Sequence, residues 1–444
     1  MPKNRKNGSG NGNGVKYLVQ ALVGLALLAG CEGGAEAPSM LKTHEQAGPS
    51  AVGALGQPAG RGLIGNLQGR RSILPPGGAY AQVSDAVISA SAGAAEAALR
   101  VARLKANAQS KNWLPSIGPS VNLTSLGGLA ASLLLEQALF DNGRRKAERA
   151  FASADVEVAA VSLTTAMNQR VFEGLSYYVN AQRARAQAIV ALAAAGRLQE
   201  FNGIIGKRVA GGLSDGSEQQ VLNQRVAEMQ ATVAVDLQTE ASQMAQLAAL
   251  SGQPLGGISG LDSLPNLDQS SAEPLAVVKA RGGGARALAQ AQMQLAGLKF
   301  GLSATAGLDD GGINPGVRLN GAGLFNPGTK DNIAALQQTG DVVDRQTAEA
   351  AETANRRIVS LQQQKANLAS RRAQGDEVLR QTAANLDLFT QQYKVGRRTL
   401  LELVGQYDAH ARLQRDQASL GYDIALIDLE IARDRGVLVD GARM

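Results

Sequence analysis

The sequence predicts a mainly α-helical protein with a small β part, in which long coiled-coil helices alternate with two β-hairpins. Residues 143–209 contain no proline, and their apolar side chains recur every three or four positions, as in a helix that packs on other helices. In residues 113–136 the period changes to two, which indicates strands. Both patterns return in the second half of the chain, so this arrangement is predicted to occur twice.

The composition favours thin helices that pack closely. The 444-residue chain is 44% hydrophobic but only 3% aromatic, and alanine supplies much of the apolar share. Alanine-rich helices packed side by side fit these values better than a thick globular core. The net charge of +6 comes without a tight basic stripe or an aromatic platform, so nucleic acid is not expected as a partner.

Residues 1–30 are predicted to be a lipoprotein signal peptide. A basic start precedes the apolar run Tyr17–Ala29, which is too short for a membrane-spanning helix of about 20 residues. The segment ends in Leu28-Ala29-Gly30-Cys31, which resembles the lipobox of bacterial lipoproteins. That resemblance implies a diacylated Cys31 as the mature N-terminus; the alternative is a plain signal peptide followed by a chance cysteine. Cys31 is the only cysteine, so no disulfide is expected.

Residues 31–83 are rich in Gly, Pro, Ala and Ser and lack periodicity, so an extended tether is predicted there. The first structural repeat is predicted over residues 84–251. It begins with a helix that runs from Ser84-Asp85, a candidate N-cap, to about Lys111.

Within this repeat, the two strands on either side of Gly127-Gly128 are each about nine residues long, the length that crosses an outer membrane at a tilt. The long helix of residues 143–209 follows, and at 1.5 Å per residue it would extend for roughly 100 Å. It is expected to end in a turn over residues 210–217, and a return helix is predicted from Glu218 to about Leu250.

The rest of the chain is divided into a linker, a second structural repeat and a tail, over residues 252–274, 275–438 and 439–444. In the second repeat, Gly282-Gly283-Gly284 is predicted to break a helix, and a second hairpin is predicted with a loop over residues 309–315. A second long helix is expected from about Lys330 to Val395, with a return helix from Leu400 to about Arg435.

Matching features of the two halves are separated by nearly the same number of positions. The phrase Leu324-Phe325-Asn326-Pro327-Gly328 echoes Leu139-Phe140-Asp141-Asn142-Gly143, and the two phenylalanines differ by 325 − 140 = 185 positions. The turn glycines Gly212 and Gly396 differ by 396 − 212 = 184 positions. An offset shared by strands, helices and turns indicates an internal duplication.

This order of elements, twice over, resembles the TolC family of outer-membrane efflux and secretion channels. The resemblance is carried by the two Leu-Phe-x-x-Gly junctions, by Gly212-Leu213-x-x-x-Ser217-Glu218, and by the run Tyr393–Leu403, which is close to the family's second tip motif. It covers about residues 84–438. The order of the elements matches the family specifically, whereas the sequence identity away from the tips is weak.

The resemblance implies a homotrimer in which each subunit lends four strands to a 12-stranded transmembrane β-barrel, while the helices form a coiled-coil barrel in the periplasm. Physical reasoning also requires partner chains, because four strands cannot close a barrel and open sheet edges are not tolerated in lipid. The implied role is the passive exit duct of a tripartite efflux pump or a type I secretion system. Its implied setting is the outer membrane, with a periplasmic adaptor protein and an inner-membrane pump as partners.

The family also implies a gate at the periplasmic helix tips. Carried over by position, the gate candidates are Ser217, Glu218, Tyr393, Arg398 and Glu402. The alternative is a solvated helix end, with Arg398 and Glu402 as an ordinary i,i+4 pair worth about 0.3–0.5 kcal/mol. The candidates for adaptor docking are Gly212, Leu213, Val395 and Gly396, which turn geometry alone would also select.

No catalytic or metal site is predicted, and the protein is not expected to be an enzyme. His44 and His410 are the only histidines, and they lie far apart in the chain. No cofactor is expected apart from covalent lipid on Cys31. The alternative function is a periplasmic coiled-coil lipoprotein with a structural or adaptor role, whose hairpins would be soluble.

Overall fold

The structure is a computed structural model, and it describes residues 62–124, 128–264, 267, 272–309, 312–320 and 328–443. The chain divides into two compact units, residues 1–58 and 59–444, and every described residue belongs to the second unit. The predicted signal peptide and Cys31 therefore lie outside the described residues.

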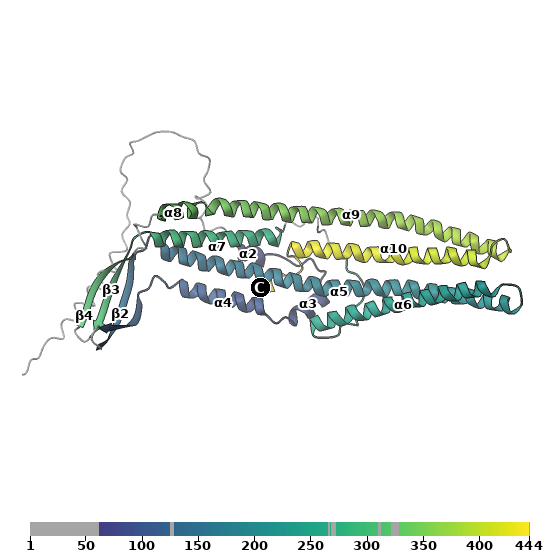
Figure 1. The fold of residues 1–444 in the computed structure, drawn as a ribbon, viewed down its shortest axis with the longest axis horizontal. Coiled ribbons are helices and arrows are strands. Elements are labelled where there is room, and N and C mark those ends of the chain that lie inside the picture. Colours follow the sequence, from purple (N-terminus) through teal and green to yellow (C-terminus); the bar gives the residue numbers. More distant parts are fainter. Residues whose placement is uncertain are drawn as a thin grey trace, which may run out of the picture. The chain divides into compact units, whose positions relative to one another are not determined.

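The second unit is mainly helical with one small sheet (Figure 1). Its helices are α2 (Leu63–Gln68), α3 (Ala79–Ser89), α4 (Ala94–Gln109), α5 (Arg144–Ala210), α6 (Gly216–Ser251), α7 (Leu275–Leu298), α8 (Thr329–Gln337), α9 (Thr339–Lys394), α10 (Leu400–Asp434) and the short 3-10 helix η3 (Gly441–Arg443). Its strands are β1 (Ser116–Thr124), β2 (Gly128–Phe140), β3 (Gly301–Asp309) and β4 (Gly312–Asn320).

The predicted first long helix is confirmed as α5, an uninterrupted helix of 67 residues. It packs against α4, α6, α7 and α10, and many of its buried positions are alanine. Because alanine side chains are short, neighbouring helices can approach α5 closely along most of its length. An 18-residue window of α5 is apolar enough to cross a membrane, but 44% of that window is buried against the rest of the protein.

The predicted second long helix is two helices, α8 and α9, separated at Gln338. Figure 1 shows α7 and α10 following one another between α5 and α9, and both of them pack against both long helices. The unit is therefore a layered array of helices, in which two long helices enclose shorter ones.

Gly282-Gly283-Gly284 does not break the helix as predicted, because α7 runs through all three glycines. A Cβ atom on Gly284 would lie 2.3 Å from Cγ1 of Val343 on α9. A Cβ atom on Gly282 would meet Leu63 and Val158 at 3.5 Å. The glycines thus let neighbouring helices approach α7, and this packing outweighs their low helix propensity of about 1 kcal/mol per residue.

The predicted extended tether is wrong for its described part, residues 62–83. This part contains α2 and the start of α3, and Leu67 and Tyr80 are fully buried there. The predicted helix from Ser84 to Lys111 is also two helices, α3 and α4, separated at Gly93, whose φ of +65° favours glycine. Ser84 is buried inside α3 and is not an N-cap.

The largest apolar core joins α3, α5, α6, α9 and α10. At its centre Tyr80 and Tyr178 pack edge to face with ring centroids 6.3 Å apart. The Tyr178 hydroxyl donates to the Gly260 carbonyl at 2.7 Å, and burial raises the pKa of Tyr178 to about 12. This core fixes the linker after α6 against the middle of α5.

Residues from opposite ends of the described chain meet beside this core. The Arg70 guanidinium donates to the carbonyls of Arg435 at 2.6 Å and Glu273 at 2.9 Å. The Leu438 N–H donates to Asn168 Oδ1 at 2.9 Å, inside the protein. The described part of the predicted tail is packed in the same place, since Val439 is buried and the Gly441 N–H donates to the Arg70 carbonyl.

The four strands form one antiparallel sheet in the order β1-β2-β3-β4. Strand β4 begins at Gly312, so the predicted loop over residues 309–315 is too long. Pro119 in β1 and Pro315 in β4 lie in the edge strands, where proline is tolerated. The sheet connects to the helices through Phe140 at the end of β2 and Phe300 before β3.

We expect Gly284→Ala to destabilise the protein by about 1–3 kcal/mol, because the new methyl group overlaps Val343. Gly283→Ala is the matched control: a Cβ atom there meets nothing within 4 Å, so alanine should be neutral or stabilising. Thermal unfolding of the two purified variants provides the measurement. A Gly284→Ala protein as stable as the Gly283→Ala protein would contradict this account of α7.

Candidate functional site: an amphipathic sheet and two helix tips

The sheet has one continuous apolar face. The register places Ile117 of β1 beside Leu135 of β2, Leu135 beside Ala306 of β3, and Ala306 beside Pro315 of β4. The same face carries further exposed apolar side chains on three strands, namely Leu133, Leu308, Ile313, Val317 and Leu319. In water this face would be unfavourable, because it exposes several large apolar side chains side by side.

The opposite face of the sheet is mostly polar or small. It carries Ser116, Glu136, Thr305, Asn314 and Arg318, and the last of these approaches Glu136 Oε2 at 4.0 Å. Alternation of apolar and polar residues along each strand produces these two faces. Within the described part of the chain, β1 and β4 each pair on one side only, so each presents an open edge.

Aromatic side chains lie where the strands meet the helices. Trp113, Phe140 and Phe300 are all exposed at this level and form a sparse aromatic belt. Phe325, the counterpart of Phe140 in the second repeat, lies outside the described residues. Aromatic residues at such a boundary are typical of a membrane interface.

Both helix tips end in the same backbone motif. Gly212 and Gly396 have φ values of +69° and +75°, and each N–H donates to the carbonyl three residues earlier. The next residue in each tip donates to the carbonyl five residues earlier, which completes a Schellman cap. Leu213 and Val395 flank these glycines and are 73% and 69% exposed. The four docking candidates therefore lie at the two protruding turns.

At the second tip, Arg398 and Glu402 form an ion pair of 3.0 Å. Thr399 and Glu402 form a reciprocal capping box at the start of α10. The backbone N–H of Thr399, then Arg398, hold the pKa of Glu402 below its ordinary value. Arg398 also bonds Gln392 Oε1 at 3.1 Å and covers the Phe389 ring. Tyr393 packs half-buried against the apolar cluster beneath.

At the first tip, Asp215 caps α6 by accepting from the Ser217 N–H at 3.2 Å. Its carbonyl accepts from the Glu218 N–H. Hydrogen bonds from the Ser217 N–H and then from the Ser217 side chain to the carboxylate hold the pKa of Asp215 below its ordinary value. Among the described residues, no hydrogen bond or ion pair joins Ser217 or Glu218 to the second tip. The structure thus brings Arg398 and Glu402 together but leaves the two sets of gate candidates apart.

The two tips are joined within one chain by apolar packing. Leu198, Phe201 and Ile205 of α5 pack with Leu222 of α6 and Leu403 of α10 in one buried cluster. The apolar periodicity of these helices indicated a packed face, but not which helix would cover it.

The sequence analysis did not predict the ion pairs that lie further along the helices. Arg415 on α10 bonds the nearly fully buried Asp236 on α6, with Nε to Oδ2 at 3.0 Å. The bond with Asp236 raises the pKa of Arg415. Arg225 on α6 approaches Asp408 on α10 at 3.7 Å. The only feature of the sequence that could have indicated this ion pair is that Asp236, a charged residue, lies on the apolar stripe of the return helix α6.

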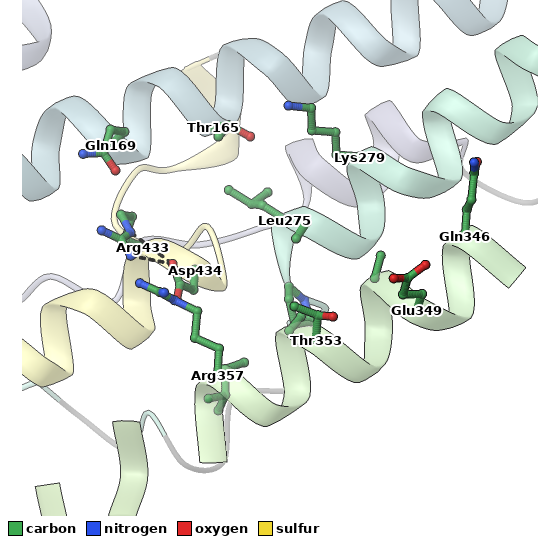
Figure 2. A pocket seen from close by; sticks show the side chains of 15 residues that line it. Thr165, Gln169, Leu275, Lys279, Gln346, Glu349, Thr353, Arg357, Arg433 and Asp434 are labelled. Carbon is green, nitrogen blue, oxygen red and sulfur yellow. Dashed lines mark hydrogen bonds and ion pairs between the residues drawn. The ribbon is translucent and has the colours of Figure 1, made fainter. Parts of the chain in front are cut away.

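A cavity of about 760 Å³ lies where α10 ends and α7 begins, beneath α9 (Figure 2). One wall is apolar and includes Leu275 and Ile358. The other carries Arg357, which bonds Asp434 at 2.7 Å and Glu430 at 2.6 Å. The bond with Asp434 is the main reason that the pKa of Arg357 is raised. The ion pairs thereby connect α9 to the end of α10.

No protein-family model and no curated protein matches the sequence. Solved structures do match, at low identity. The outer membrane protein VceC from Vibrio cholerae has a TM-score of 0.71 and 16% identity, over 80% of this chain and 96% of that one. The Campylobacter jejuni CmeC outer membrane channel has a TM-score of 0.67 and 12% identity, over 82% of this chain and 88% of that one.

The outer-membrane channel OprN has a TM-score of 0.65 and 16% identity, over 90% of this chain and 98% of that one. Similarity over nearly the whole length of each of these proteins, at such low identity, establishes the arrangement of elements rather than a shared activity. The long helices, the four-stranded sheet and the two turns all belong to that shared arrangement. The chain has the fold of the TolC-like outer-membrane channels.

Proposed function

We propose that the protein is one subunit of a homotrimeric outer-membrane channel, in which three four-stranded sheets close a 12-stranded barrel. The observation that carries this proposal is the sheet with one apolar face and two open edges. Lipid would cover the apolar face, and strands of neighbouring subunits would pair with β1 and β4. The polar face, with Glu136 and Arg318, would line the lumen.

The helices would form the periplasmic part of the conduit. At about 1.5 Å per residue, the 67 residues of α5 extend for roughly 100 Å, which is far more than a small barrel needs for support. The proposed role is a passive exit duct for a tripartite efflux pump or a type I secretion system. The alternative of a periplasmic coiled-coil lipoprotein would leave the apolar face of the sheet in water, which disfavours it.

The proposed partners are a periplasmic adaptor protein at the tips and, through it, an inner-membrane pump. Leu213 and Val395 support the adaptor contact, because large apolar side chains at the ends of two protruding turns are suited to docking. Site-specific cross-linking from these two positions to a co-expressed adaptor would test it; no cross-link from either position would count against tip docking.

The anchor is proposed to be covalent lipid on Cys31. The sequence Leu28-Ala29-Gly30-Cys31 supports it. Cys31→Ser should abolish labelling by radioactive palmitate, while an unlabelled wild-type protein would exclude the anchor.

Assembly provides the main test of the channel. The protein purified in detergent should be a trimer that conducts ions in planar bilayers. Val317→Lys places a charge on the apolar face and should reduce the recovered trimer, at a cost of about 2–4 kcal/mol if the site lies near the bilayer centre. Asn314→Lys, on the polar face of the same strand, is the matched control. A stable monomer that needs no detergent would contradict the proposal.

The gate is proposed to act between subunits, because within one chain the gate candidates bond only inside their own tips. We expect Tyr393→Phe with Arg398→Ser to raise single-channel conductance. If each change removes one link of about 1 kcal/mol, the closed–open equilibrium shifts about thirtyfold.

Two controls accompany the gate variant. Thr399→Ala breaks the capping box and keeps both charges, so it separates helix capping from gating. Arg185→Ser with Arg371→Ser removes two exposed charges from the long helices. The nearby Arg183 is not used as a control, because it forms an ion pair with Asp423 at 2.7 Å. If Thr399→Ala opens the channel as much as the gate variant does, the tip residues act as caps and not as a gate.

A further inference from the structure

The polar face of the sheet continues into a second cavity, of about 580 Å³, where the sheet meets the helices. Ala138 of β2 pairs with Ser303 of β3, and both residues line the cavity together with Glu136. All three belong to the face that is proposed to line the lumen. The start of α5 and the end of α7 complete the cavity. It therefore lies in the proposed lumen wall, at the junction between the barrel and the helices.

The carboxylates of this cavity all have partners. Glu148 forms an ion pair with Arg144 at 3.1 Å. Asp141 accepts hydrogen bonds of 3.0 Å from two backbone N–H groups at the start of α5. Glu136 is approached at 4.0 Å by Arg318 of β4. Each negative charge is therefore offset, either by a cation or by the N–H groups at a helix start.

Lys299 is an exposed cation of this cavity. It directly follows the end of α7, and its backbone is extended. Because side chains alternate along an extended chain, Lys299 lies on the side of Ser303, whereas Phe300 lies on the apolar side. Among the described residues, no carboxylate approaches the Lys299 ammonium within 4.0 Å, and no hydrogen bond engages it. Its charge is therefore available to solutes in the lumen.

Arg145 adds a second positive charge behind this surface. Within the described part of the chain its guanidinium has no ion-pair partner, and its Nη1 atom is covered by protein. A covered charge does not touch a solute, but it raises the potential of the wall, because protein screens it less than water does. The charged groups that line the cavity, together with Arg318 beside it, are four cations and three carboxylates. One net positive charge remains in each subunit.

We propose that the three Lys299 side chains of the trimer form a ring of cations at the junction between the barrel and the helices, and that this ring favours the passage of anions. Rings of lysine or arginine in a water-filled pore attract anions and repel cations. The solutes that the ring favours carry carboxylate, sulfate or phosphate groups. This assignment rests on the proposed function, because the ring exists only if three subunits enclose a lumen.

The test measures reversal potentials of the full-length protein in planar bilayers under a gradient of KCl. We expect Lys299→Gln to lower the permeability ratio of chloride to potassium by about twofold or more, because three charges leave the lumen wall. Lys299→Arg is the matched control, since it keeps the charge and should keep the ratio. Glu136→Gln should raise the ratio, because it leaves the charge of Arg318 without its counterpart.

The comparison between variants isolates the ring, because the charges at the helix tips are the same in all of these proteins. The effect of Lys299→Gln should also shrink at high ionic strength. The Debye length falls from about 10 Å at 0.1 M salt to about 3 Å at 1 M salt, so the ring then acts over a shorter range.

Three results would overturn the cation ring: an unchanged permeability ratio in Lys299→Gln, an equal loss in Lys299→Arg, or a lower ratio in Glu136→Gln. The conductance of the same preparations keeps the two proposals apart. Trimers that conduct ions but show any of these three results would remove only the ring. A protein that forms neither a trimer nor a channel would remove the proposed function, and the ring with it.

Discussion

Close approach of helices along α5 is the constraint on which the rest of the unit depends. Six helices (α2, α3, α4, α6, α7 and α10) pack against this one helix, and a long row of alanines makes room for them. Gly284 extends the same principle to α7, where even a methyl group would collide with Val343. Aromatic side chains could not replace these residues without separating the helices. The low aromatic content of the sequence is thus a consequence of the architecture.

The sheet depends on this array of helices. A four-stranded sheet with an apolar face has no helix of its own chain to cover it, among the described residues, and the long helices hold it at one end of the array. The two open edges need strands of other chains to pair with, whereas the uncovered face needs an apolar surface packed against it. A trimer in a membrane meets both, which is why the proposed function follows from the sheet rather than from any single residue.

The sequence predicted the elements whose pattern is local, and it missed the contacts between distant ones. The stripe of α5 and the alternation of the strands are periodic over many residues, so both were found. The three glycines ending at Gly284 were wrongly predicted to break a helix. Local helix propensity does not show that Val343 packs against Gly284. The Arg398–Glu402 pair follows from i,i+4 spacing, whereas Asp236 and Arg415 lie 179 positions apart and only the fold brings them together.

The bond between Arg70 and Arg435 has a consequence for the order of folding. Its partners are separated by 365 positions, and the cluster around it includes contacts of similar range. Contacts of such long range form slowly, because the entropy of closing a very large loop must be overcome first. The bond from Arg70 to the Arg435 carbonyl cannot form until the chain has been made as far as residue 435. The helix pairs can form locally before then, so closure of this contact is a late event in folding.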